Sequence, residues 1–226
     1  AWKKFDGVIS INQQEMAEVC SVIGDNRVLY CPMGINLEDW IYSYQPEFPP
    51  RFGFYGGLGS EVNQKFALFV LREIMPKVWN RLPNAQLWLI GSNPSPKLRK
   101  EALKDNRVTI TGFLDDPRPS LSSMTAIICP WEGVFGFRSR LIEVLSLGIP
   151  VIASPDAYAG MNLSENHGVL PAKNILDFVI LCEKLVTDHS FAEEQSNLAR
   201  LEIEKKFSIE STYEKLFSDL KARCSN

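Results

Sequence analysis

Short apolar runs alternate along the chain with segments whose apolar residues recur at helical spacing. One run, residues 126–129 (AIIC), is apolar throughout, as expected of a strand covered on both faces of a parallel sheet. The pattern predicts eight strands, at residues 7–11, 27–30, 52–55, 86–90, 108–110, 126–129, 151–153 and 168–170. Such alternation predicts an α/β fold, a Rossmann-like parallel sheet with right-handed crossovers and helices on both faces.

Three segments carry helix signals. Ser60 is placed to cap a first helix whose apolar stripe recurs every four residues. The stripe consists of Phe66, Val70, Ile74, Val78 and Leu82. A second helix is expected from near Arg138 to Gly148. The last part, about residues 174–222, is almost wholly helical in pattern, with Ser211 and Glu214 spaced as a capping box.

Ligands of open parallel sheets bind outside the carboxyl ends of the strands. The loops that follow strands are therefore the candidates for a site, namely residues 56–59, 91–94, 111–114 and 130–136. Residues 43–51 are rich in proline and are interpreted as a linker that enters the main domain.

Composition narrows the class of protein. The 226 residues carry 24 Lys and Arg against 27 Asp and Glu, a net charge of -3, so general nucleic-acid binding is not expected. The apolar runs are far shorter than the roughly 18 residues of a membrane span, and the first residues lack a signal-peptide pattern. Five widely spaced cysteines and two histidines, His167 and His189, form no metal-binding cluster and favour a reducing, cytoplasmic compartment.

The glycine turn at residues 56–59 lies between a predicted strand and a predicted helix. Backbone N–H groups at such a turn, at the positive end of a helix, are suited to bind an anion such as a phosphate. The turn is not the dinucleotide fingerprint, because residue 62 is Val, and it is not a P-loop. By itself, such a glycine turn is more often only a tight connection between a strand and a helix.

Arg140 and Glu143 are three residues apart on a predicted helix, so they share one face and lean toward its N-terminus. A guanidinium there could bind a diphosphate, and the carboxylate could accept hydrogen bonds from a ribose diol. The alternative is an exposed ion pair of little energetic weight. Glu132, in the preceding loop, is a weak candidate for the same pocket and the only catalytic candidate.

In order and spacing, six stretches resemble the C-terminal, donor-binding half of group 1 (retaining, GT-B fold) glycosyltransferases. They are residues 6–11 and 29–36, residues 54–58 (FYGGL) followed by Asn63, residues 83–91, residues 108–116, and residues 138–150 with 151–154 after them. The last stretch is similar to the family's signature helix and next strand, and the whole resemblance spans residues 6–187.

This resemblance implies roles for particular residues. Glu143 falls on the signature glutamate that holds the ribose, and Arg140 falls where many members have a lysine on the diphosphate. Gly56 and Gly57 would bring backbone close to the donor phosphates and sugar. Backbone at Phe113 and Leu114 is expected to meet the nucleobase edge. The implied substrate is a UDP- or GDP-sugar, with no cofactor and no metal.

Two departures from the family pattern concern the donor. Many members carry an acidic residue eight positions before the signature glutamate, where this chain has Phe135; Glu132 lies eleven before it. Basic residues that often follow the first donor-domain strand are replaced by Gly57 and Val62. The diphosphate charge is then expected to rest on Arg140, Arg138 and helix N-termini.

The resemblance also divides the chain. Residues 1–42 are expected to be a remnant of the N-terminal acceptor domain with the linker, and residues 43–226 the nucleotide-sugar-binding domain with the C-terminal helices. The acceptor, a glycan or lipid-linked molecule, would be bound through the missing N-terminal domain, which could also contact the inner membrane face. The chain alone is expected to bind donor and turn over little.

Two alternatives stay open at this point: a non-catalytic nucleotide-sugar-binding subunit of a split glycosyltransferase, and a sugar-nucleotide epimerase of the same fold. Whether the chain is a truncated piece or a natural subunit, and its oligomeric state, are not decided by the sequence.

Overall fold

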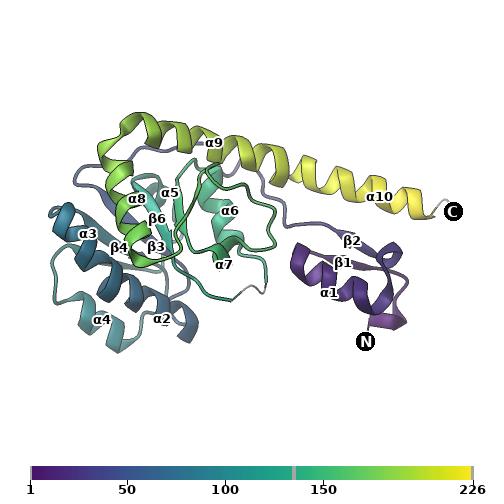
Figure 1. Ribbon diagram of the computed structural model, residues 1–226, viewed down its shortest axis with the longest axis horizontal. Helices are drawn as coiled ribbons and strands as arrows, with labels where there is room; N and C mark the ends of the chain where they lie inside the picture. The colour runs from purple at the N-terminus through teal and green to yellow at the C-terminus, as the bar shows by residue number, and fades with distance from the viewer. Residues whose placement is uncertain (1, 134–135, 225–226) are drawn as a thin grey trace.

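Two parallel sheets organise the chain in the computed structural model, which describes residues 2–133 and 136–224 (Figure 1). The small sheet pairs β1 with β2, and the large one has the order β5-β4-β3-β6-β7-β8. The bounds are β1 Val8–Ser10, β2 Val28–Tyr30, β3 Arg51–Tyr55, β4 Gln86–Ile90, β5 Val108–Gly112, β6 Ala126–Cys129, β7 Val151–Ala153 and β8 Val169–Pro171. All eight predicted strands are confirmed.

The large sheet has its switch point between β3 and β6. β3, β4 and β5 succeed one another toward one edge, and β6, β7 and β8 toward the other, all in parallel register. Every residue of β6 and β7 is buried, and successive residues of a strand face opposite sides, so both faces of the sheet are covered. The predicted fold class is therefore confirmed, and a ligand crevice is expected at the carboxyl ends of β3 and β6.

Helices surround the large sheet, and two helices, α1 and α10, contact the small one (Figure 1). The bounds are α1 Gln13–Ile23, α2 Glu61–Phe69, α3 Met75–Arg81, α4 Pro96–Ala102, α5 Arg118–Ser122, α6 Ser139–Ser146, α7 Pro155–Tyr158, α8 Ile175–Thr187, α9 His189–Phe207 and α10 Lys215–Cys224. Single 3₁₀ turns lie at Trp2–Lys4 and Asp25–Arg27, and π-helical segments at Val70–Ile74 and Glu210–Glu214.

The helical pair α2–α3 explains the four-residue spacing of its apolar stripe. Ser60 caps α2 as predicted, because its Oγ accepts a hydrogen bond from the Asn63 N–H at 3.1 Å. A repeat of four drifts away from the 3.6 residues of an α-helical turn. The underwound segment Val70–Ile74, between α2 and α3, offsets that drift, and the stripe is buried from Phe66 to Val78.

The C-terminal helices return along the molecule toward its N-terminal part (Figure 1). Arg223 on α10 donates hydrogen bonds to the carbonyls of Asn26 and Val28, beside β2. The predicted capping box at Ser211 is wrong. The cap is Ser208, whose Oγ accepts the Ser211 N–H at 3.0 Å, and Ser211 itself lies inside the π-helical segment.

The proline-rich segment runs over the main unit without regular structure. The Ser43 N–H donates to the Leu147 carbonyl at 3.0 Å, and the Tyr44 hydroxyl donates to the Thr125 carbonyl at 3.1 Å. The division of the chain into domains 1–42 and 43–226 stays a prediction. α10 belongs to the second of these predicted domains, yet it packs on β2, which belongs to the first.

Candidate functional site

A cavity of about 200 Å³ lies at the carboxyl ends of β3, β4 and β5. Five of the predicted donor-binding residues line it: Gly56, Gly57, Phe113, Leu114 and Arg140. They come from the loops after β3 and β5 and from α6, so the sheet brings together residues that are far apart in the sequence. Phe113 is 73% exposed at the rim.

The floor of the cavity depends on close approach of two backbone segments. The Gly56 N–H donates to the Ile90 carbonyl at 3.0 Å, so this amide is already engaged and is not free for a phosphate. A Cβ on Gly91 would lie 1.8 Å from the Gly56 carbonyl oxygen, whereas one on Gly57 would meet nothing within 4 Å. Gly57 therefore faces open space, and Gly91 is required by packing against the turn.

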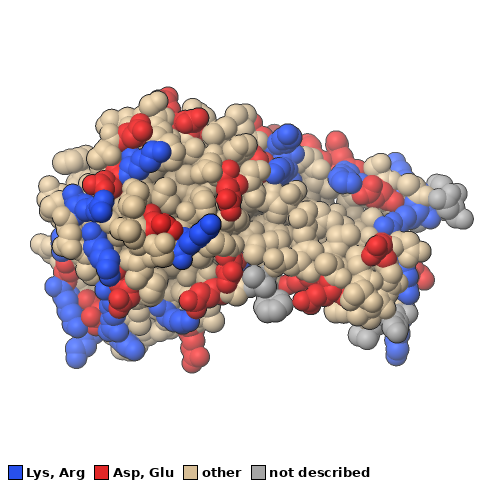
Figure 2. Space-filling view, in the orientation of Figure 1, with Lys and Arg blue, Asp and Glu red and all other residues tan. Residues whose placement is uncertain are grey.

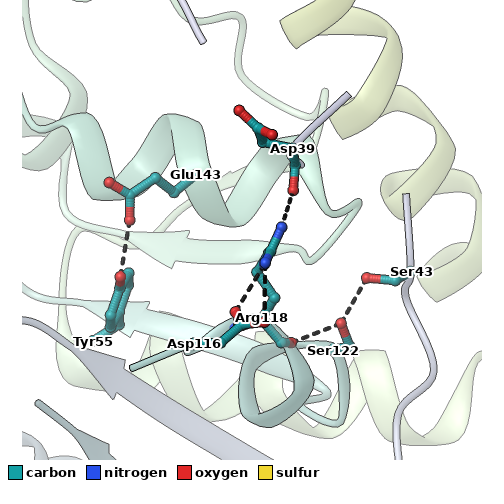
Figure 3. A network of polar contacts seen from close by, with 7 residues as sticks. All are labelled: Asp39, Ser43, Tyr55, Asp116, Arg118, Ser122 and Glu143. Atoms are coloured by element: carbon teal, nitrogen blue, oxygen red, sulfur yellow. Dashed lines mark hydrogen bonds and ion pairs between the residues drawn. The ribbon is translucent and has the colours of Figure 1, made fainter. Parts of the chain in front are cut away.

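Tyr55, the last residue of β3, contacts both Arg140 and Glu143, and Figure 3 shows its contact with Glu143. The Tyr55 hydroxyl donates to Glu143 Oε2 at 2.9 Å, and the Arg140 guanidinium carbon lies 5.4 Å from the Tyr55 ring centroid. Burial raises the pKa of Tyr55, and the charge of Glu143 raises it further, so the phenol keeps its proton. Sequence reasoning missed Tyr55, although its place just before the glycine turn was a usable signal.

Arg138 has a different environment from Arg140. Its guanidinium donates to the carbonyls of Gly133, Asp156 and Ala157, and it lies 5.5 Å from the centroid of the Trp131 ring. Burial lowers the pKa of Arg138, but three carbonyl partners compensate the buried charge. Arg138 thus joins the loop after β6 to α7, and its predicted contact with a diphosphate stays a prediction.

A second cavity of about 210 Å³ adjoins the first at Arg140. Glu132 and Trp131 are among its lining residues. Glu132 is exposed and pairs with Lys65 at 3.0 Å, so it stands at the rim with a cation beside it. The Trp131 indole nitrogen is buried and has no hydrogen-bond partner among the residues that the structure describes. Phe135, the departure from the family's acidic position, lies outside the described residues.

The N-terminal part touches this region through α1. Asn12 is fully buried; its amide donates to the Gly136 carbonyl at 2.9 Å, and its oxygen caps the first N–H groups of α1. Glu15 Oε1 accepts the Gly136 N–H at 2.7 Å. Both side chains hold the backbone that leads from β6 into α6. Neither contact was foreseen, because such pairings across 120 residues leave no local sequence pattern.

A polar network holds the loop after β5 (Figure 3). Arg118 pairs with Asp116 at 2.8 Å and also donates to the Asp39 carbonyl, while Ser122 and Ser43 are hydrogen-bonded at 2.6 Å. The hydrogen bonds from Arg118 hold the pKa of Asp116 below its usual range. Linker and loop are therefore fixed to one another next to Phe113 and Leu114.

Figure 2 shows Lys and Arg interspersed with Asp and Glu on the face in view, with no broad area of one sign. Among residues 2–133 and 136–224, no three His, Cys, Asp or Glu side chains are placed to hold a metal ion. Within the same residues, no helix has the length and apolar character needed to cross a membrane.

The structure combines a parallel sheet with a switch point, a glycine turn after β3 and an Arg-Glu pair on α6, the helix that follows β6. Open α/β sheets bind their ligands at such a switch point. The chain belongs to the glycosyl transferases group 1 family, whose model matches residues 49–188. The predicted family resemblance is thereby confirmed. No curated protein sequence matches the chain significantly.

Solved structures with the same fold include three from bacteria. A Staphylococcus aureus TarM variant in complex with fondaparinux, alpha-GlcNAc-glycerol and UDP has 17% identity and a TM-score of 0.73, over 96% of this chain and 44% of that one. Anabaena HepE with UDP and glucose has 12% identity and a TM-score of 0.74, over 96% of this chain and 63% of that one. Sucrose-phosphate synthase of Thermosynechococcus elongatus has 20% sequence identity and a TM-score of 0.74, over 98% of this chain and 60% of that one. The chain thus spans about half to two thirds of the length of these proteins.

Proposed function

We propose that this chain is the donor-binding half of a retaining glycosyltransferase, which moves a sugar from a UDP- or GDP-sugar to a glycan or lipid-linked acceptor. The observation that carries this function is the convergence of Gly57, Leu114 and Arg140 on one cavity, with Glu143 joined to its wall through Tyr55. Family membership supports it, as does the fold shared with TarM and HepE, whose structures contain UDP.

The donor would lie across the two adjoining cavities. Backbone at Phe113 and Leu114 would meet the nucleobase, Glu143 the ribose, and Arg140 the diphosphate. The sugar would extend toward the second cavity, where Glu132 stands at the rim. As the acceptor attacks, negative charge grows on the leaving diphosphate, and a fixed guanidinium and backbone N–H groups stabilise that charge. No cofactor beyond the substrate is part of this scheme.

The acceptor would be bound on the other side of the site. Residues 1–42, as the end of an acceptor domain, reach the donor side through Asn12 and Glu15. We place the activity in the cytoplasm, in polysaccharide synthesis, where a peripheral contact with the inner membrane face would serve a lipid-linked acceptor. The four cysteines with described side chains are unpaired, as a reducing compartment requires. Membership of the glycosyl transferases group 1 family favours a transferase over an epimerase.

Calorimetric titration with UDP, GDP, ADP and UMP tests the function. One diphosphate of uridine or guanosine should bind, and Glu143→Ala should weaken it about 10- to 100-fold, because a carboxylate–hydroxyl contact contributes about 1.5–3 kcal/mol. Arg140→Ala should weaken the diphosphate more than the monophosphate. The matched control is Glu204→Ala, which removes an exposed glutamate on α9, remote from the cavities. Binding of no nucleotide, or equal binding by Glu143→Ala, contradicts the function.

A further inference from the structure

The Tyr55 side chain contacts both Arg140 and Glu143. Its ring lines the first cavity, its hydroxyl donates to Glu143 Oε2 at 2.9 Å, and its ring centroid lies 5.4 Å from the Arg140 guanidinium carbon. Figure 3 shows the Tyr55 side chain pointing from the end of β3 directly to Glu143 on α6. One aromatic residue therefore links the two charged groups that the proposed donor would meet.

The direction of the hydrogen bond is fixed by chemistry. An ionised carboxylate only accepts, so the phenol must donate its single proton to Glu143. Because burial and the nearby carboxylate both raise the pKa of Tyr55, the phenol stays protonated at neutral pH and above. A glutamate side chain otherwise rotates about three bonds, and ordering it on ligand binding costs conformational entropy. The bond from Tyr55 removes much of that cost beforehand.

We propose that Tyr55 is a positioning residue for the donor: it holds Glu143 Oε2 so that the remaining oxygen, Oε1, accepts from a ribose hydroxyl. The Tyr55 ring also supports the Arg140 guanidinium at the side of the cavity where the diphosphate of the donor would bind. This role rests on the proposed function, and it assigns ribose selectivity to a residue outside the Arg-Glu pair. Because the bond from Tyr55 fixes Oε2 and leaves Oε1 directed to the ribose, one ribose hydroxyl should carry most of the recognition by Glu143.

The test compares ribose and deoxyribose ligands. For whichever of UDP and GDP binds, Kd is measured with the 2′-deoxy and 3′-deoxy forms, in the wild-type chain and in Tyr55→Phe, which keeps the ring and removes only the hydroxyl. In the wild type, one of the two deletions should weaken binding about tenfold. In Tyr55→Phe, the ribonucleotide should bind about five- to tenfold more weakly, while that deoxy ligand binds as before, so the preference falls to about twofold or less.

The chain supplies a matched control in a second Tyr–Glu pair. The Tyr158 hydroxyl donates to Glu165 at 2.6 Å, and neither residue lines the two cavities. Tyr158→Phe should leave both Kd values and their ratio unchanged. A merely structural role of Tyr55 would weaken ribose and deoxyribose ligands equally.

Two results overturn the positioning role alone: an unchanged ribose preference in Tyr55→Phe, or tighter ribonucleotide binding, which would mean that the phenol competes with the ribose. In both cases the wild type still binds and Glu143→Gln still weakens binding, so the proposed function stands. Absence of binding to UDP and GDP in the wild type overturns the function and the role of Tyr55 together.

Discussion

Replacement of Gly91 by alanine tests how the sheet positions the glycine turn. A Cβ at residue 91 would lie 1.8 Å from the Gly56 carbonyl oxygen, and real Cβ atoms do not approach closer than 3.0 Å. The turn would have to retreat by at least about 1.2 Å, the difference between these two distances. The φ of +152° at Gly91 adds strain for any other residue.

The expected cost follows from these two terms. Overpacking of this kind costs about 1–3 kcal/mol, and an unfavourable backbone conformation about 1–2 kcal/mol. We expect Gly91→Ala to lower the free energy of unfolding by about 3 kcal/mol, or Tm by about 6–12 °C at this chain length. The retreat of the turn should also weaken nucleotide binding, because Gly56 and Gly57 line the cavity.

Urea unfolding followed by tryptophan fluorescence measures the loss, with calorimetry for the nucleotide. The control for stability is Gly57→Ala in the same turn, where an added Cβ meets nothing within 4 Å. It should change the free energy of unfolding by less than about 0.5 kcal/mol. If Gly91→Ala is as stable as Gly57→Ala, the close approach of these backbone segments does not constrain residue 91 to glycine.

Three further outcomes are expected. Arg138→Ala should lower the free energy of unfolding by about 2–3 kcal/mol, because it leaves carbonyl acceptors without their donor. Arg140 is exposed, so Arg140→Ala should lower it by less than about 0.5 kcal/mol. Equal urea midpoints of the two variants would contradict this. Hydrogen bonds from a neighbouring arginine and then a lysine hold the pKa of Glu101 at about 2, below its ordinary 4.5, so its stabilising effect is present above pH 4.5 and lost toward pH 2. The urea-midpoint advantage of wild type over Glu101→Gln should shrink across that interval, and a constant difference would count against the assignment. Burial raises the pKa of the Cys129 thiol to about 12. After thiol labelling at pH 8, mass mapping should therefore find Cys129 protected and the partly exposed Cys20 modified more rapidly. Equal labelling of the two cysteines would contradict the burial of Cys129.

Strands were predictable from sequence because burial on both faces leaves continuous apolar runs. Residues 126–129 are an example, and β5 exceeds its prediction only by Thr111 and Gly112, whose polarity and flexibility mask the strand. The stripe from Phe66 to Val78 predicted the buried face, but its spacing gave no sign that a π-helical segment was needed. The capping box failed because Ser208, three residues earlier, offers the same chemistry.

The candidate site was predictable in part. Loops after strands converge by topology alone, so the approach of Phe113, Leu114 and Arg140 followed from the parallel sheet. Local pattern does not reveal which side chain a charge will meet. It therefore missed the hydrogen bond from Tyr55 to Glu143 and the three carbonyls that engage Arg138.

A crystal structure of this chain with the nucleoside diphosphate that it binds would locate the donor site. We expect the base at the backbone of Phe113 and Leu114, a ribose hydroxyl within hydrogen-bond distance of Glu143, and the diphosphate beside Arg140. A nucleotide bound elsewhere on the chain, or bound here with Glu143 turned away from the ribose, would contradict this expectation.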